Sequence, residues 1–189
     1  IVIMLLIIIG GIGFFTWEDI YLHKFHFKHY HMQSKVILTT TLCLILLPAV
    51  FFFFQDYGNL SGIHRLLASL FQAVTPRTAG FNTTDLSMLT GASKAMMILL
   101  MLIGGSPSST AGGMKTTTFA LLLLNVLATF QSCDDVTAFG RRIDASVIKN
   151  ATTIAMMYFI LFFAGGMTIS VYAVSYTHLR AHETDSYLV

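Results

Sequence analysis

The stretch VILTTTLCLILLPAVFFFF at residues 36–54 carries no charged side chain and is bounded by Lys35 and Asp56. A helix needs about 20 mostly apolar residues to cross the hydrocarbon core of a bilayer, which is about 30 Å thick. The length and composition of this run therefore predict a membrane-spanning helix. Most soluble folds are excluded, because a long helix without a charged face must be surrounded by lipid or by other apolar helices.

The composition of the whole chain supports a membrane protein. Of the 189 residues, 55% are apolar and 11% are Asp, Glu, Lys or Arg, against about 25% charged residues in an average soluble domain. The net charge is +2, and the charges fall in short clusters, so we expect no nucleic-acid partner. Cys43 and Cys133 match neither a disulfide nor a zinc spacing. We expect an all-α polytopic membrane protein whose surroundings are the lipid bilayer.

Three further apolar regions are candidate spans. Residues 1–15 are apolar from the first letter and look like the end of a longer helix. Residues 95–128 are apolar but are interrupted by GGSPSSTAGG, and residues 151–174 are uncharged and long enough to cross. Lys and Arg concentrate at residues 22–35 and 131–150, which predicts cytosolic loops there under the positive-inside rule. Six basic residues then lie inside, against three outside: Arg65, Arg77 and Lys94.

Histidines recur in the first of these loops, HKFHFKHYHMQSK, at positions 23, 26, 29 and 31. Zinc sites of this kind usually include Cys pairs or a carboxylate at helical spacing, and the loop has neither. We therefore expect an interfacial loop that binds no metal.

Residues 61–76, SGIHRLLASLFQAVTP, predict a helix that is too short to cross the membrane. Its apolar residues recur at helical spacing, Ser61 is placed to cap its start, and Pro76 disfavours a helical residue before it. About 13 helical residues at 1.5 Å each extend roughly 20 Å. We expect a half-helix at 62–75 that enters the membrane, followed by a polar loop that is tolerated there only if it lines water or is buried in protein.

A full span, a short re-entrant helix, a polar loop and another apolar segment make up a pore-loop unit. The C-terminal end of the short helix carries the negative end of the helix dipole, which favours a cation. We place an ion filter at residues 78–82, where backbone carbonyls replace the hydration shell of an alkali cation. Glycine permits the backbone angles that this needs, although a purely structural turn is the alternative. The expected ion ligands are the backbones of Thr78, Ala79, Gly80 and Phe81.

The interruption within residues 95–130 is a second candidate site. Glycine costs about 1 kcal/mol and proline about 3 kcal/mol, relative to Ala, inside a helix, so this segment predicts a broken helix near mid-membrane; a plain kink is the alternative. Lys115 follows the break, and we expect it to face a water-filled cavity or, alternatively, to extend to the interface. The residues that make the break are Gly104, Gly105, Ser106, Pro107, Gly112 and Gly113.

Two enzyme motifs fail at this break. A phosphate-binding G-x-x-x-x-G-K-[ST] loop requires Lys directly after the glycine and a preceding strand, but Met114 separates Gly113 from Lys115. A G-x-S-x-G nucleophile elbow lacks its final glycine here. An intramembrane serine hydrolase would need a base near Ser106, and no His lies in an apolar span. We therefore expect no enzyme activity.

The two candidate sites also carry a resemblance to a known family. TPRTAGFNTTDL followed by MLIGGSPSSTAGGMKTTTFALLL resembles the third membrane–pore–membrane repeat of the Trk/Ktr/HKT superfamily of potassium and sodium transporters. IGGIGFFTWEDI resembles the end of the second repeat, and FGRRIDASVIKNA the start of the fourth. The resemblance assigns residues 1–21 to the second repeat, 36–130 to a complete third repeat and 151–174 to the fourth.

The resemblance implies a function as well as a fold. Four such repeats in one chain would surround a pore, and residues 104–113 would form an intramembrane gating loop that blocks its cytosolic half. The family usually has Gly at the position of Ser108. We expect potassium uptake across the plasma membrane of a bacterium, by a multi-pass protein without a cofactor, with a sodium-preferring or mixed transporter as the alternative. The expected partners are a second copy, forming a homodimer, and a cytosolic nucleotide-binding regulatory subunit.

Parts of the family pattern are absent. One filter loop is present of the four expected, and the family's basic residue in the last inner helix lies outside this chain. Residues 175–189 are abruptly polar after an apolar helix and resemble translated adapter sequence. We expect them to be a non-native tail without a function.

Overall fold

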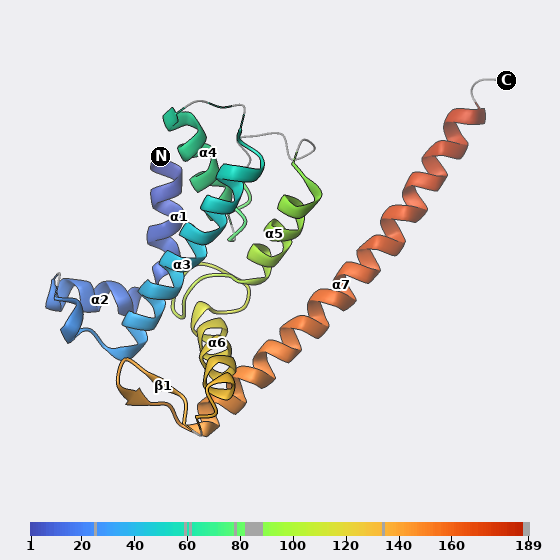
Figure 1. The fold of residues 1–189 in the computed structure, drawn as a ribbon. Helices are drawn as coiled ribbons and strands as arrows, with labels where there is room; N and C mark the ends of the chain where they lie inside the picture. Colours follow the sequence, from blue (N-terminus) through green and yellow to red (C-terminus); the bar gives the residue numbers. More distant parts are fainter. Residues whose placement is uncertain are drawn as a thin grey trace.

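The computed structural model describes residues 1–24, 26–58, 60, 62–77, 79–81, 89–133 and 135–186, with side chains up to residue 172. In the described chain, the regular elements are helices and one small hairpin, which confirms the predicted all-α architecture (Figure 1). The helices are α1 (Val2–Ile12), α2 (Phe14–His23), the short η1 (Phe27–His29), α3 (Met32–Gln55), α4 (Gly62–Val74), α5 (Gly91–Leu102), α6 (Thr116–Phe130) and α7 (Ala145–Ser186).

Helix α3 contains the predicted span and passes through Pro48 without a break. At its far end the chain reverses, and α4 returns alongside α3 (Figure 1). Arg65 of α4 fixes this corner: its Nε and Nη2 donate to the Phe53 carbonyl at 2.9 and 2.6 Å, and its guanidinium lies 4.0 Å from the centre of the Phe53 ring. The last turn of α3 therefore receives a cation, which its free carbonyls favour.

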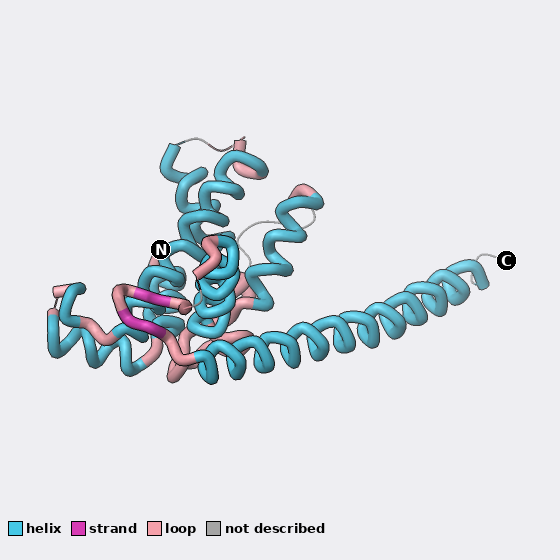
Figure 2. The backbone as a smooth tube through the Cα atoms, turned by 60° about the horizontal axis from the view of Figure 1, so that its bottom comes forward, coloured by secondary structure: helices cyan, strands magenta, loops and turns pink. Residues whose placement is uncertain are grey.

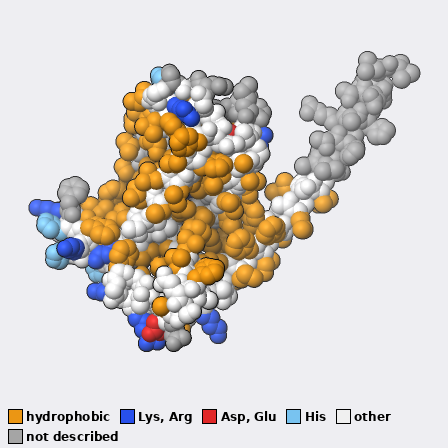
Figure 3. All heavy atoms as spheres, in the orientation of Figure 1, with side chains coloured by type: hydrophobic (Ala, Val, Ile, Leu, Met, Phe, Trp, Pro, Cys, Tyr) orange, Lys and Arg blue, Asp and Glu red, His pale blue; other side chains and the backbone are white. Residues whose placement is uncertain are grey.

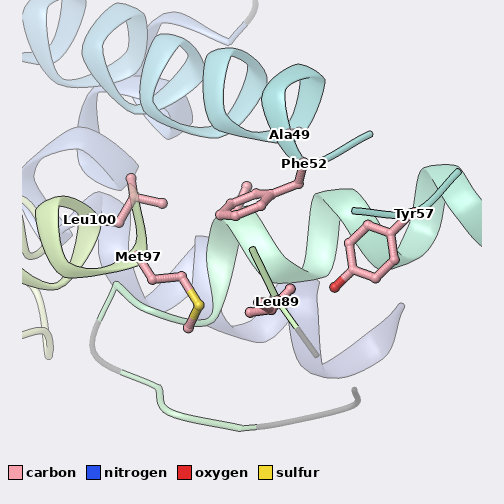
Figure 4. Close-up of a cluster of buried hydrophobic side chains, with 7 residues drawn as sticks. Ala49, Phe52, Tyr57, Leu89, Met97 and Leu100 are labelled. Carbon is pink, nitrogen blue, oxygen red and sulfur yellow. The ribbon is translucent and has the colours of Figure 1, made fainter. Parts of the chain in front are cut away.

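An apolar cluster holds α4 between α3 and α5 (Figure 4). Within it, the buried Gln72 of α4 accepts a 3.4 Å hydrogen bond from the Tyr57 hydroxyl and donates to Met97 Sδ at 2.9 Å. A buried amide with partners on both sides positions α4 more exactly than apolar contact alone. The buried members of the cluster are Ala49, Phe52, Tyr57, Ala73, Leu89, Met97 and Leu100.

Helices α5 and α6 are the two parts of the predicted interrupted helix. The start of α5 is capped by Thr90, whose hydroxyl accepts from the Ser93 amide at 3.3 Å, and Asp56 at the end of α3 accepts from the Thr90 amide at 3.1 Å. From there α5 runs inward, and α6 continues toward the opposite end of the molecule (Figure 1). The break falls at residues 103–115.

Helices α1 and α2 meet at a bend of 93°. We expected residues 1–21 to form the end of one helix, but Gly13 adopts a φ of +88° between the two parts. A residue with a Cβ rarely takes this angle, so the chain changes direction at the glycine. Helix α2 carries Glu18, Asp19 and His23, and we place it outside the membrane-spanning part.

A β-hairpin joins α6 to α7 (Figure 2). Strand β1 (Thr137–Ala138) pairs with β2 (Arg141–Arg142), and both turn residues, Phe139 and Gly140, have positive φ, as in the mirror-image turns that close tight hairpins. The hairpin was not foreseen. It packs against α3 and α6 through Val36, Ala120, Val136, Ala138 and Ile143. We call the region of β1, β2, α2 and the start of α3 the hairpin end.

Helix α7 packs against α6 near its start and then extends away from the other helices (Figures 1 and 2). It contains the predicted span 151–174, and its backbone stays helical into the segment expected to be a tail. In the described part of the chain, α3 and the Ala145–Tyr172 part of α7 are long and apolar enough to cross a membrane; the bent pair α1–α2 is a third candidate if it counts as one span.

Apolar side chains cover much of the body of the molecule, and basic side chains gather around the hairpin end (Figure 3). The basic residues there are Lys24, Lys28, Lys35, Arg141, Arg142 and Lys149. Such an apolar exterior suits contact with lipid or with further helices rather than with water.

Candidate functional site

The predicted filter folds back over the end of α4. The Thr75 carbonyl, left free where the helix ends, accepts from the amides of Ala79 and Gly80 at 3.2 and 3.0 Å, and Gly80 has a φ of +70°. The Thr75 hydroxyl donates to the Phe81 carbonyl at 2.5 Å, which leaves that oxygen one further acceptor site. Gly80 and Phe81 are exposed. Thr78 and position 82 of the predicted filter lie outside the described residues.

The break between α5 and α6 is a loop closed at its base by backbone hydrogen bonds. The Gly104 amide donates to the Met114 carbonyl at 2.9 Å, the Met114 amide to the Leu102 carbonyl at 3.2 Å, and the Thr116 amide to the Gly105 carbonyl at 3.1 Å. The two arms lie so close that a Cβ on Gly104 would be 1.6 Å from the Gly112 carbonyl oxygen. The glycines therefore permit two backbone arms to pair where a helix would otherwise continue.

Polar side chains complete the loop. Ser106 and Thr116, both 0% exposed, share a 3.1 Å hydrogen bond between their hydroxyls. Lys115 donates from Nζ to the Ala111 carbonyl at 2.9 Å, so its ammonium is held across the loop; that it faces a cavity stays a prediction. Pro107 is half-buried. Ser108 has a φ of +57°, an angle at which glycine is favoured.

Arg77 joins the two predicted sites. Its Nη2 donates to the Gly104 carbonyl at 3.2 Å, and the residue is 8% exposed. Counting Arg77 among the outer basic residues was wrong, because the side chain is buried between the filter segment and the loop. The signal in the sequence was its place directly after Pro76, at the end of the predicted half-helix.

A small cavity adjoins this contact. It has a volume of about 10 Å³ and is lined by Ile7, Ile8, Gly11, Thr41, Val74, Arg77 and Gly105. Among the described residues, Arg77 Nε and Thr41 Oγ1 are buried without a hydrogen-bond partner. A space of this size holds about one water, which suits two polar atoms of this kind.

Asp19 organises the histidine-rich segment. Its carboxylate, on a residue that is 4% exposed, accepts from the His31 amide at 3.0 Å and lies 2.7 Å from His31 Nδ1. Burial opposes ionisation of this carboxyl, but hydrogen bonds from Ser34 and His31 outweigh it and hold the pKa of Asp19 below its usual value. Asp19 thus caps the start of α3. In the described chain, no group of three or more His, Cys, Asp or Glu is placed to hold a metal ion.

Comparison with known proteins shows one family over nearly the whole chain and relatives that cover about half of it or more. Residues 1–179 match the TrkH family, described as cation transport protein. Ktr system potassium uptake protein B of Bacillus subtilis (strain 168) is 34% identical over 177 residues, which cover 90% of this chain and 40% of that protein. Potassium/sodium uptake protein NtpJ of Enterococcus hirae is 35% identical over 175 residues, covering 90% and 39%. Ktr system potassium uptake protein B of Vibrio alginolyticus is 36% identical over 101 residues, covering 49% and 22%.

The chain therefore spans about two fifths of the length of the first two relatives. The match confirms the predicted superfamily. The family and these relatives are described as transport or uptake proteins and not as enzymes, so the serine-hydrolase alternative is left without support. With its apolar helices and its match over residues 1–179, this chain belongs to the TrkH family of cation transport proteins.

Proposed function

We propose that this chain supplies one pore-loop unit of a potassium uptake protein, in which α3 and the pair α5–α6 flank α4 and its filter segment. The observation that carries this is the 3.2 Å hydrogen bond from Arg77 Nη2 to the Gly104 carbonyl. It brings the residue next to the filter into contact with the first glycine of the interrupted helix. A filter and a gate must lie on one ion path, and this contact holds the two segments together.

The end of α4 suits a cation. Its dipole places negative charge at Val74, and the chain beyond it includes the exposed residues Gly80 and Phe81. The carbonyls of Thr78, Ala79, Gly80 and Phe81 would form one strand of a filter to which three other repeats contribute. We propose the loop 104–113 as the gate, because it lies directly beside Arg77 on the side toward the hairpin end.

The transported ion is K⁺ in this proposal. Two of the relatives named above are potassium uptake proteins. Potassium/sodium uptake by NtpJ keeps a mixed or sodium-preferring transporter as the second candidate. No resident cofactor is needed, because backbone carbonyls can bind the ion.

We orient the protein with the hairpin end in the cytosol of a bacterial cell and the protein passing several times through the plasma membrane. Six basic residues lie at that end, and Arg65 and Lys94 at the other, once Arg77 is recognised as buried. This asymmetry is what the positive-inside rule expects. A homodimer and a cytosolic nucleotide-binding regulatory subunit remain part of the proposal on the family resemblance.

The filter is tested by Gly80→Ser in a full-length family member that carries this segment. A Cβ on Gly80 meets no atom within 4 Å, so its effect comes from opposing the φ of +70°. We expect weaker selection of K⁺ over Na⁺ in competition uptake assays. Gly91→Ser is the matched control, because Gly91 also has open space but an ordinary φ. Equal selectivity in both variants would contradict the filter.

The gate is tested by deleting residues 107–112 in the same protein. A segment that blocks the path imposes a barrier, and the barrier disappears with it. We expect higher potassium flux, less dependence on the regulatory partner and unchanged selectivity. A deletion that inserts and folds normally yet lowers flux would mean that the break is a kink with no gating role. The isolated segment, with one filter strand, should restore no uptake to a transport-deficient cell.

A further inference from the structure

The bend between α1 and α2 lies against the loop 104–113 and shares backbone hydrogen bonds with it. The Ser106 amide donates to the Gly11 carbonyl at 2.9 Å, and the Thr110 amide to the Gly10 carbonyl at 3.4 Å. In the opposite direction, the Phe14 amide donates to the Ser108 carbonyl at 3.1 Å. Two interrupted helices, far apart in the sequence, are thus joined through their main chains.

These hydrogen bonds satisfy backbone groups that have no partner within a helix, because α1 ends and the α5–α6 helix is interrupted there. The last four carbonyls of a helix have no partner within it, and in α1 they belong to residues 9–12. The Ile9 carbonyl accepts from Trp17 Nε1 at 3.0 Å, while Gly10 and Gly11 use the loop. Unpaired backbone groups are expensive within a membrane. Separating the loop from the bend would therefore leave polar groups unpaired on both sides.

The contact is close enough to require glycine. A Cβ on Gly13 would lie 2.4 Å from the Pro107 carbonyl oxygen, and a Cβ on Gly105 would lie 3.2 Å from the Gly11 carbonyl oxygen. Gly13 also holds the φ of +88° that aims α2 away from α1. By contrast, a Cβ on Gly11 would meet nothing within 4 Å. The bend and the loop thus fit closely together, and this close fit depends on the absence of a Cβ at Gly13 and Gly105.

We propose that the α1–α2 bend is a latch that holds the loop 104–113 in its blocking position, with Gly13 as the positioning residue. This rests on the proposed gating function and adds what restrains the gate. The loop leaves the ion path only when its hydrogen bonds to Gly10, Gly11 and Phe14 break. Its position is therefore set from the helix pair α1–α2 as well as from α5 and α6.

The first test is Gly13→Ala in a full-length family member that carries this segment. Gly91→Ala is the control, because a Cβ on Gly91 meets nothing within 4 Å and Gly91 belongs to neither the bend nor the loop. A Cβ at Gly13 penalises the latched position, and a small penalty shifts a two-state population severalfold. We expect potassium flux without the activating partner to rise about fivefold in Gly13→Ala and to stay unchanged in Gly91→Ala. Equal flux in both variants, with normal membrane insertion, would overturn the latch.

A second test does not depend on Gly13→Ala folding. A Cβ on Gly10 would lie 3.2 Å from Thr110 Oγ1, so Gly10→Cys with Thr110→Cys should form a disulfide under mild oxidation, after Cys43 and Cys133 are changed to Ser. With the activating partner present, oxidation should lower potassium flux and a reductant should restore it. Failure to form the disulfide, or its formation without loss of flux, would overturn the latch.

The deletion of residues 107–112 separates this proposal from the one on which it rests. If the deletion raises flux but the disulfide has no effect, the gate stands and the latch fails. If the deletion lowers flux in a folded protein, the gating function itself fails. A rise on deletion together with a reversible loss on oxidation supports both.

Discussion

Helix α3 and the pair α5–α6 are both apolar segments with residues that disfavour a helix, yet one is continuous and the other is broken. Pro48 lies inside α3 and removes one backbone donor, but the helix continues to Gln55. Between α5 and α6 the chain leaves the helix for a full loop. The difference lies in what receives the freed backbone groups. Around the break, the loop pairs with itself and with the α1–α2 bend.

The comparison shows that a single breaking residue does not decide where a membrane helix ends. In α3, a helical proline leaves one carbonyl without its usual partner, and neighbouring structure tolerates this. A loop, in contrast, frees many groups at once and needs a prepared set of partners. Glycine makes such hydrogen-bond partners available, because the absence of a Cβ allows two backbone segments to approach closely. The break is thus a tertiary feature as much as a local one.

The largest expected effect is that of Gly104→Ala. Its Cβ would lie 1.6 Å from the Gly112 carbonyl oxygen, so the paired arms must separate. We expect the free energy of unfolding in detergent to fall by about 3 kcal/mol. Gly112→Ala is the control, since a Cβ there meets nothing within 4 Å, and it should change stability little. Equal stability of the two variants would show that the break does not depend on close backbone pairing.

A smaller effect is expected at the start of α3, which, unlike α6, is capped by a side chain from another helix. Asp19→Asn should lower the free energy of unfolding by about 1 kcal/mol at neutral pH, with Glu18→Gln as a neutral control. The folded-state pKa of Asp19 is lowered, so its stabilisation is present above the unfolded pKa and is lost as pH falls through the folded one.

Unfolding measured from pH 7 down to the acid range checks this. The difference between the original protein and Asp19→Asn should be constant at neutral pH and shrink below about pH 4. A difference that is already lost between pH 5 and 7 would assign the stabilisation to a group other than Asp19.

The smallest effect is that of Pro48→Ala. The substitution restores one amide to α3 but removes part of a buried side chain, and these changes oppose each other. We expect the free energy of unfolding to change by less than about 1 kcal/mol and the helix content measured by circular dichroism to stay the same. A stabilisation of more than about 2 kcal/mol would mean that Pro48 strains α3, and that α3 and the interrupted α5–α6 pair differ less than proposed above.

The sequence predicted those elements that are determined by residues close together in the chain. The uncharged run in α3 and the end of α4 before Pro76 follow from length, hydropathy and backbone restrictions. The loop after Ile103 was predicted from its glycines. The 93° bend, the burial of Arg77 and the capping of α3 by Asp19 were missed, because each depends on a partner distant in the sequence. The glycines of IGGIGFF supported the family resemblance. The contact of this segment with Ser106 and Ser108 could not be predicted, because it depends on the tertiary structure.

Helix α6 has a mechanical consequence for the break at its start. Its 15 residues form a strut of roughly 22 Å. At one end the Thr116 amide donates to the Gly105 carbonyl. Further along the helix, Leu124 and Ala128 pack against the cluster that contains Val136 and Ala138 of the hairpin region. A helix resists compression along its axis better than a loop does. A movement of the hairpin along the axis of α6 would therefore displace Gly105 as well, because the helix between them shortens little.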